Sequence, residues 1–303
     1  MVGACVVFSS CAGPRGSGCL VGAFWMDRPS AASIESFAKD YGKRPAIVLT
    51  FLDWGKYPDE AVMRDVYSSD SVLMLTWEPW HAETKQAIDY DAVLAGKDDA
   101  YLREFATRLK TIGRPVFLRF AHEMNGDWYP WSAQKIGSEK YRQLFRYVHE
   151  AFDRAGAANV RWVFSISAEN VPDSNRYDRC YPGEHYADYI GLDGYNWGVT
   201  RAWSRWRSFK DLFSGIYAEG VKKYPKPMII SEFGTTSKGG DKARWIEEAL
   251  QEVRRMPEVK ALVLFNVDKE TDWKFMPGTE AAKALKKGLG DPYYRDAMIK
   301  NLI

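Results

Sequence analysis

The chain has 303 residues, of which 46% are hydrophobic and 15% aromatic, and a formal net charge of +2. This length suits a single α/β barrel domain, and the balanced charge provides no field that would attract nucleic acid or an anionic membrane. No run of about 18 apolar residues occurs, so we expect no membrane span and no nucleic acid partner.

The first segment, residues 1–18, is expected to be a tail or the remnant of an export signal. It contains a short apolar stretch and many small residues, but it lacks the early positive charge of a complete secretory signal. The segment could be the remnant of a lipoprotein signal that ends at Cys11. A wrongly assigned start codon or a plain tail would explain it equally well. The expected location is extracellular or at the cell surface, with the export route left open.

Residues 19–303 are expected to form one catalytic domain. Short apolar runs with little alternation, typical of strands covered on both faces, are separated by segments of helical periodicity. The eight runs span residues 19–26, 45–54, 71–79, 115–125, 159–167, 188–196, 226–234 and 260–268. Ser138 and Asp241 are expected to begin two of the helices as N-terminal caps.

Eight strands that alternate with helices predict the α/β class and a (β/α)8 TIM barrel. An open, doubly wound sheet is the alternative. That fold usually has a glycine-rich phosphate loop after its first strand, whereas here the first strand ends in Phe24-Trp25-Met26-Asp27. The closed barrel is therefore preferred, and we expect it to be a monomer.

The ends of the predicted strands combine carboxylates with aromatic side chains and few cations. In a (β/α)8 barrel the active site lies at the carboxyl ends of the strands. This composition is typical of a sugar-binding site, because aromatic faces stack on pyranose rings while carboxylates, amides and imidazoles bind hydroxyl groups. Glu123 and Glu232 end the fourth and seventh strands, which lie across the barrel mouth. Retaining hydrolysis of a glycosidic bond uses two such carboxyl groups about 5–5.5 Å apart.

Glu123 is the expected general acid/base, and Glu232 is the expected nucleophile. Strand alternation places Glu123 on the same face as Arg119, and Glu232 on the same face as Met228 and Ile230. Arg119 is expected to keep Glu232 ionised, because a nearby cation favours the carboxylate.

Other side chains near the strand ends are expected to support catalysis or bind substrate. Tyr195 is expected to donate a hydrogen bond to Glu232, and His122 to bind a substrate hydroxyl or to orient Glu123. The remaining expected contacts are Trp77, Glu78, Trp80, Asn125, Trp128, Tyr129, Trp131, Trp197, Asp272 and Trp273. The carboxylates that compete for the catalytic roles are Glu78, Glu169 and Asp193, although Asp193 also suits a hydrogen bond to the turn at Gly194.

No metal ion and no organic cofactor is expected. The four His and four Cys residues show no spacing typical of a zinc site. A metal-dependent barrel hydrolase is a competing hypothesis, but it needs His-rich strand ends, and His81, His149 and His185 lie elsewhere.

The cysteines leave the redox compartment open. Three of them, Cys5, Cys11 and Cys19, lie in or beside the tail, and the fourth is Cys180. A bridge between Cys19 and Cys180 is one option that the sequence does not decide.

The run RFAHEMNGDWYPW, residues 119–131, resembles the fourth-strand signature of glycoside hydrolase family 26. The segments 231–234 and 190–195 are similar to the family's nucleophile strand and sixth strand, and the order and spacing agree over about residues 20–275. The resemblance implies a retaining barrel enzyme with Glu123 as acid/base, Glu232 as nucleophile, and His122 and Tyr195 as their neighbours. The family consists mostly of endo-β-1,4-mannanases, with β-1,3-1,4-glucanases and β-1,3-xylanases as minorities.

The third strand departs from the mannanase pattern. Mannanases of the family tend to carry Trp-His there and bulky Trp residues where this chain has Tyr129-Pro130, whereas this strand ends in Trp77-Glu78-Pro79-Trp80. The preferred expectation is therefore an endo-acting hydrolase of mixed-linkage β-1,3-1,4-glucan, similar to a lichenase. An endo-β-1,4-mannanase is the alternative, and a carbohydrate-binding barrel without catalysis is a more remote one.

Overall fold

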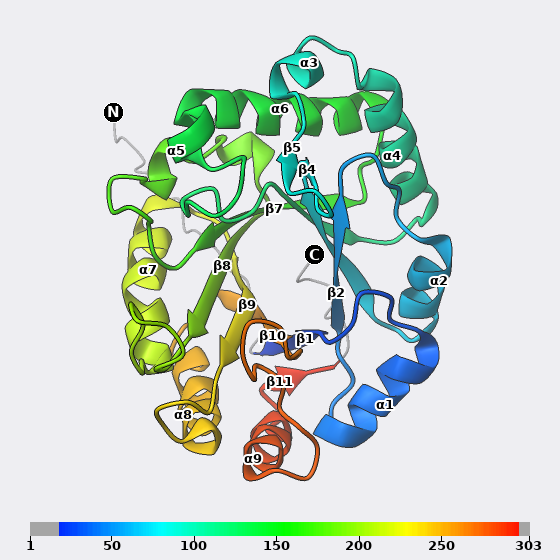
Figure 1. Ribbon diagram of the computed structural model, residues 1–303. Helices are drawn as coiled ribbons and strands as arrows, with labels where there is room; N and C mark the ends of the chain where they lie inside the picture. Colours follow the sequence, from blue (N-terminus) through cyan, green and yellow to red (C-terminus); the bar gives the residue numbers. More distant parts are fainter. Residues whose placement is uncertain (1–17, 297–303) are drawn as a thin grey trace, which may run out of the picture.

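The computed structural model describes residues 18–296, which form a closed barrel of parallel strands surrounded by helices (Figure 1). The strands follow the order β1, β2, β3, β6, β7, β8, β9, β10, and β10 pairs with β1 to close the ring. This arrangement confirms the predicted single-domain (β/α)8 barrel, and the open sheet is excluded by the closing pair.

The strands of the ring are β1 (Cys19–Phe24), β2 (Ile47–Asp53), β3 (Val72–Glu78), β6 (Val116–Phe120), β7 (Val160–Ser167), β8 (Tyr189–Asn196), β9 (Met228–Thr235) and β10 (Val259–Phe265). Each of them lies within or overlaps one predicted run. The fourth run was predicted to be too long, because β6 ends at Phe120 and the chain then turns. A short strand, β11 (Tyr294–Arg295), adds to the start of β1 outside the ring.

The main helices are α1 (Ala31–Tyr41), α2 (Glu60–Ser68), α4 (Asp99–Thr111), α6 (Ser138–Ala155), α7 (Phe209–Lys223), α8 (Lys242–Val253) and α9 (Glu280–Leu289). The shorter ones are α3 (Tyr90–Leu94), α5 (Ala133–Ile136) and the 3-10 turns η1 (Tyr177–Cys180) and η2 (Glu184–Tyr186). Asp241 caps α8 as predicted, since its carboxylate accepts from the amides of Ala243 and Arg244 at 2.9 and 3.0 Å. The predicted cap at Ser138 is wrong, because Gly137 occupies that position and Ser138 is the first helical residue.

The hydrophobic core has two layers. Apolar side chains such as Ile47, Met74 and Val263 fill the barrel interior. A second layer lies between the strands and the helices, where α6 buries Leu144 and Phe145. Both faces of each strand are therefore covered, which explains the continuous apolar runs of the sequence.

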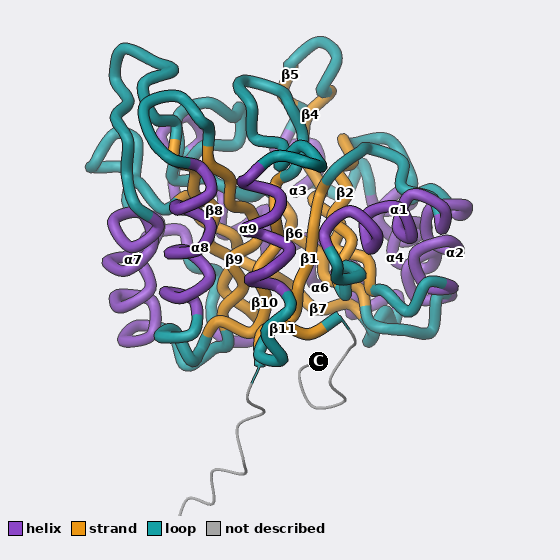
Figure 2. Tube along the Cα trace, turned by 90° about the horizontal axis from the view of Figure 1, so that it is seen from below, coloured by secondary structure: helices purple, strands orange, loops and turns teal. Residues whose placement is uncertain are grey.

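The loops that follow the carboxyl ends of the strands gather at one end of the barrel, opposite β11 (Figure 2). They include the hairpin formed by β4 (Trp80–His81) and β5 (Gln86–Ala87). These loops form the walls of the barrel mouth. Within residues 18–296, no helix combines the length and the apolar character that a membrane crossing requires.

Cys19 and Cys180 are both buried free thiols, so the optional bridge between them is not formed. Cys19 opens β1, whereas Cys180 lies in η1. Cys5 and Cys11 lie outside the described residues, as does the predicted tail apart from Gly18.

Candidate active site

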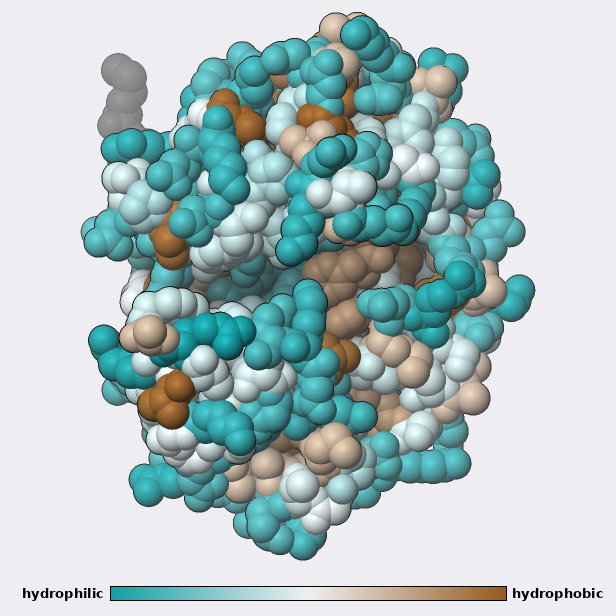
Figure 3. Space-filling view, in the orientation of Figure 1, coloured by the Kyte–Doolittle hydropathy of each residue, from teal (hydrophilic) through white to brown (hydrophobic). Residues whose placement is uncertain are grey.

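A groove crosses the centre of the barrel mouth, where the space-filling view looks onto the carboxyl ends of the strands (Figure 3). Glu123 and Glu232 both lie at this end of the barrel, after β6 and within β9. Neither carboxylate is placed by the simple strand alternation that the sequence predicted.

Glu232 lies near the carboxyl end of β9, where a β-bulge changes the direction of the side chains. The pairing with β8 skips Ser231, because Ile230 and Glu232 face consecutive residues of that strand. Met228 and Ile230 therefore point outwards into the layer beneath the helices, whereas Glu232 turns inwards to Arg119. The predicted common face of Met228, Ile230 and Glu232 is wrong, since alternation does not continue through a bulge.

Glu123 lies in the turn after β6 and not in the strand itself. Ala121 and Glu123 have φ angles of 49° and 52°, in the left-handed region that residues other than glycine rarely adopt. The amide of Glu123 donates to the carbonyl of Ser165 on β7 at 2.9 Å, which holds the turn against the neighbouring strand. The expected shared strand face of Arg119 and Glu123 is therefore wrong. A strained turn aims Glu123 instead, at a cost of about 1–3 kcal/mol for each such residue.

Arg119 joins the two sides of the barrel beneath the groove. Its fully buried guanidinium donates to Glu232 Oε1 at 2.8 Å, to Asp193 Oδ2 at 2.6 Å and to Thr76 Oγ1 at 2.8 Å. The hydroxyl of Tyr195 donates to the second oxygen of Glu232. Both carboxylate oxygens of Glu232 thus accept hydrogen bonds, and these contacts fix the orientation of the group.

Asp193 lies inside the barrel and does not serve the turn at Gly194. Its carboxylate accepts from Ser165 Oγ at 2.9 Å and from Ser231 Oγ at 2.7 Å, in addition to Arg119. With these donors Asp193 is a buried counterion that fixes the position of Arg119.

Glu123 has the environment of a general acid. Burial, followed by the negative charges of Asp193 and Glu232, raises the pKa of the Glu123 carboxyl well above its ordinary value. The indole of Trp128 donates to Glu123 Oε2 at 2.8 Å and orients the group. A carboxyl group whose protonated form is favoured in this way suits the general-acid role in retaining hydrolysis.

His122 is buried beside the groove and stays neutral. Burial, together with the charge of Arg119, lowers the pKa of His122 well below its ordinary value. Its ring packs against Tyr129 with centroids 4.8 Å apart, and its buried Nδ1 has no hydrogen-bond partner among the described residues. Although His122 precedes Glu123 in the chain, the two side chains do not hydrogen-bond to each other.

Glu78 ends β3 and adds a further carboxyl group to the groove. Trp80 Nε1 donates to Glu78 Oε2 at 3.1 Å, and the side chain is buried. Burial, with a smaller contribution from the charge of Glu232, raises the pKa of Glu78 to about 7. Glu78 is therefore able to give or accept a hydrogen bond when it meets a substrate hydroxyl.

Replacing Glu78 by Gln should flatten the pH dependence of stability. Folding raises the pKa of Glu78 from 4.5 to about 7. The native state then keeps a proton that the unfolded chain releases, so the free energy of unfolding falls as pH rises through this window, by about 3 kcal/mol. Urea unfolding at pH 5 and pH 8 should show this loss in the parent and a smaller loss in Glu78→Gln. Glu83→Gln, at an exposed position, is the control, and an equal loss in parent and Glu78→Gln would contradict the prediction.

Only some of the predicted aromatic contacts reach the groove. Trp128 is 44% exposed, and Trp80, Tyr129 and Trp197 are partly exposed. Trp80 packs edge-on against Tyr129, with ring centroids 5.5 Å apart. Among the predicted aromatic contacts, these four side chains leave a ring face exposed that can stack on a sugar.

Trp77, Trp131 and Trp273 are almost fully buried, so of the two roles expected for them they take the supporting one and are not platforms for a sugar ring. Trp77 stacks on Trp54 with centroids 4.8 Å apart, in the layer between strands and helices. Trp131 donates from Nε1 to the carbonyl of His122 at 2.7 Å and supports Tyr129 from below. Trp273 packs behind Tyr195 with centroids 5.1 Å apart. Their role is to position the residues in front of them.

Asn125 and Asp272 also hold the frame and do not face the groove with free polar atoms. The amide of Asn125 bonds both the carbonyl and the amide of Ser167, at 2.9 Å each, and so ties the turn after β6 to β7. The carboxylate of Asp272 accepts from Ser237 Oγ at 2.6 Å and from the amide of the same residue at 3.1 Å. Glu169 forms a surface ion pair with Arg207, away from the buried carboxylates.

The sequence reasoning missed the small polar residues of the Arg119 network and one exposed indole. Thr76, Ser165 and Ser231 interrupt apolar strands, which was the signal that would have marked them as inward-facing. Trp203 is 71% exposed and packs edge-on against Trp197 with centroids 5.6 Å apart. It lies in the loop after β8, farther along the chain than the strand end from which site residues were predicted.

Comparison with known proteins gives a family match and several relatives. Residues 73–238 match the model of glycosyl hydrolase family 26. Endoglucanase H of Acetivibrio thermocellus is 40% identical over 288 residues, which cover 92% of this chain and 31% of that protein. A mannan endo-1,4-beta-mannosidase of Bacillus subtilis is 29% identical over 168 residues, 52% of this chain and 41% of that protein. The chain thus spans less than half the length of these relatives.

Solved structures show the same fold at low sequence identity. A GH26 β-mannanase from Bacteroides ovatus has a TM-score of 0.69 and 19% identity, and the match covers 92% of this chain and 90% of that chain. The YdhT protein from Bacillus subtilis has a TM-score of 0.64 and 20% identity, with 92% and 86% covered.

Proposed function

Because the chain belongs to glycosyl hydrolase family 26, we propose that it is a retaining endo-glycoside hydrolase that cleaves the backbone of a β-linked polysaccharide. The observation that supports this most strongly is a pair of buried carboxyl groups in different environments. Burial and nearby negative charge raise the pKa of Glu123, whereas both oxygens of Glu232 accept hydrogen bonds, from Arg119 and Tyr195. Since polysaccharides are too large to enter cells, we place the enzyme outside the cell or at its surface.

In the first step, Glu232 attacks the anomeric carbon while Glu123 donates its proton to the leaving oxygen. The bond from carbon to Glu232 forms as the bond to the leaving sugar breaks. Glu123 is then a carboxylate, and it takes a proton from a water molecule that attacks the glycosyl-enzyme. Water replaces Glu232 on the anomeric carbon, so the configuration is retained and both carboxyl groups return to their starting states.

Arg119 and Tyr195 serve this cycle by holding Glu232 in place. Their hydrogen bonds to its two oxygens fix the direction of attack and support the charge of the carboxylate when it leaves in the second step. No step requires a metal ion or an organic cofactor.

Mixed-linkage β-1,3-1,4-glucan is the substrate that we propose. The end of β3 presents the bonded pair Glu78 and Trp80, with Tyr129 against Trp80, in place of the Trp-His arrangement expected for mannanases. The relative that matches over 92% of the chain is named an endoglucanase, which supports a glucan. The alternative is β-1,4-mannan, which is supported by the names of the relatives that match about half of the chain.

Reducing-sugar release should decide between these substrates. We expect the purified protein to act on lichenan and barley β-glucan, and to leave pure mannan intact. The Glu123→Ala/Glu232→Ala double variant is the control for contaminating activity. Activity on mannan and glucomannan alone would replace the glucan assignment with the mannanase one. Inactivity on all of these polymers would contradict the proposed hydrolase.

A further inference from the structure

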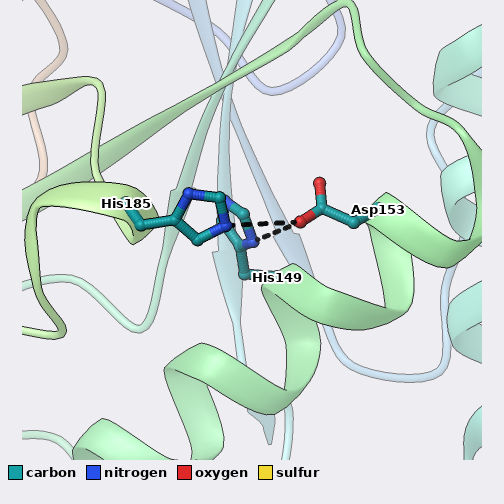
Figure 4. Close-up of side chains that lie close together, drawn as sticks. All are labelled: His149, Asp153 and His185. Atoms are coloured by element: carbon teal, nitrogen blue, oxygen red, sulfur yellow. Dashed lines mark ion pairs between the residues drawn. The ribbon is translucent and has the colours of Figure 1, made fainter.

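A second cluster of chemically reactive side chains lies far from the groove. His149 and Asp153 are one turn apart on α6, and His185 lies on η2 (Figure 4). Each offers one ligand atom, and these atoms all lie within 4.8 Å of one another. Helices run antiparallel to strands in this fold, so the end of α6 lies at the opposite end of the barrel from the catalytic loops.

His149 is only 6% exposed, and its buried Nδ1 makes no hydrogen bond. The nearest charged atom is Asp153 Oδ2, at 3.2 Å from Nδ1 but outside hydrogen-bonding geometry. The imidazole packs on Trp162 with centroids 4.9 Å apart, which fixes the direction of the ring. A buried nitrogen without a hydrogen-bond partner is costly, and a cation bound between this nitrogen and the Asp153 carboxylate would satisfy both groups.

We propose that His149, Asp153 and His185 bind a zinc ion that ties η2 to α6. Two ligand atoms at about 2.0–2.2 Å from a tetrahedral zinc ion lie about 3.3–3.6 Å apart. The separation of His149 Nδ1 from Asp153 Oδ2 is 3.2 Å, and that of His185 Nε2 from the same oxygen is 3.9 Å. A small rotation of His185, whose side chain is 75% exposed, completes the three-ligand set and leaves the fourth position to water.

The charges around the cluster favour a cation. Glu150 and Asp188 both contribute negative potential at His149 in addition to Asp153. The cation Arg146 is engaged by other groups, since its Nε donates to the carbonyl of Pro182 at 2.7 Å and its guanidinium lies over the ring of Tyr186. Imidazole and carboxylate are ligands that zinc accepts, so the donor set matches the ion.

The bound ion would act on stability and not on catalysis. It joins α6 to the connection between β7 and β8, and that connection also carries η1. A ligand that binds only the folded chain raises its unfolding temperature by mass action. This inference does not depend on the proposed function, because no residue of the cluster contacts the catalytic carboxylates.

Zinc chloride added to the tag-free full chain, after treatment with a chelator, tests the site. Titration calorimetry should show one zinc ion per chain, and saturating zinc should raise Tm by about 3–6 °C. His185→Ala should weaken zinc binding at least tenfold and remove the rise in Tm. Its exposed side chain can be removed without disturbing the fold, and an unchanged Tm in chelator verifies this.

His81→Ala is the matched control, because it removes another exposed histidine that lies outside the cluster. It should keep both the affinity and the rise in Tm. Cobalt(II) in place of zinc should give the visible absorption of a tetrahedral site in the parent and in His81→Ala, and not in His185→Ala. Equal zinc binding by the parent and His185→Ala, or no binding by either, would overturn the proposal.

Discussion

Replacing Glu232 by Gln should reduce kcat on the polysaccharide by a factor on the order of 10⁵, because the amide does not form the glycosyl-enzyme. Gln keeps the size of the side chain and still accepts a hydrogen bond from Arg119 or Tyr195, so the groove should remain intact. Binding of oligosaccharide to the inactive variant, measured by calorimetry, separates the loss of chemistry from a loss of folding.

Azide distinguishes the roles of the two carboxylates. In Glu123→Ala, azide should attack the glycosyl-enzyme on an activated aryl glycoside and yield a glycosyl azide with retained configuration. In Glu232→Ala, azide replaces the nucleophile itself and should yield the inverted product. Glu169→Gln, whose carboxylate lies in a surface ion pair, is the matched control and should keep parental kcat. Inverted azide product from Glu123→Ala would show that the two roles are exchanged.

Replacing Arg119 by Met should lower the free energy of unfolding by about 3–5 kcal/mol and also reduce kcat. Removal of one partner of a buried ion pair leaves uncompensated charge in the barrel, here on Asp193 and Glu232. Part of that cost is avoided if Glu232 takes up a proton, but a protonated Glu232 is no longer a nucleophile. Urea unfolding and kcat measured on the same preparations test both effects.

The double variant Arg119→Met/Asp193→Asn should recover part of the lost stability without recovering activity. Removing the charge of Asp193 relieves the unpaired carboxylate, whereas Glu232 still lacks its cation. Arg244→Met breaks an exposed pair with Glu248 and should leave the urea midpoint unchanged. A single variant Arg119→Met that unfolds at the parental urea concentration would refute a buried charge network as the support of the site.

The sequence alone was sufficient to predict the fold and to single out the two carboxyl groups that we propose as the catalytic pair. Continuous apolar runs report strands that are covered on both faces, and eight of them match the closed ring of the structure. Glu123 and Glu232 were singled out because each lies at or near the carboxyl end of a mostly apolar strand. Burial strongly disfavours charge, so a carboxylate at such a position indicates a specific use.

The direction of these side chains was not predictable from periodicity. The bulge at Ser231 and the left-handed residues Ala121 and Glu123 break the two-residue repeat on which the sequence argument relied. Each feature is set by contacts with neighbouring strands, such as the hydrogen bond from Glu123 to Ser165. Local sequence does not contain those contacts.

Which aromatic residues face the groove and which support them from behind also depends on the tertiary structure. Trp77 and Trp128 look alike in the sequence, yet one stacks inside the core and the other is 44% exposed beside Glu123. The proposed zinc ligand His185 shows no metal spacing with Asp153, because the chain forms β7 and η1 between them before η2 packs against α6. Composition and periodicity determined the barrel and indicated where along the chain the polar strand ends lie. Both can be inferred from the sequence because buried strands appear in it as continuous apolar runs. The contacts among distant strands and loops decided which of the marked side chains meet, because such contacts depend on packing that no local pattern records.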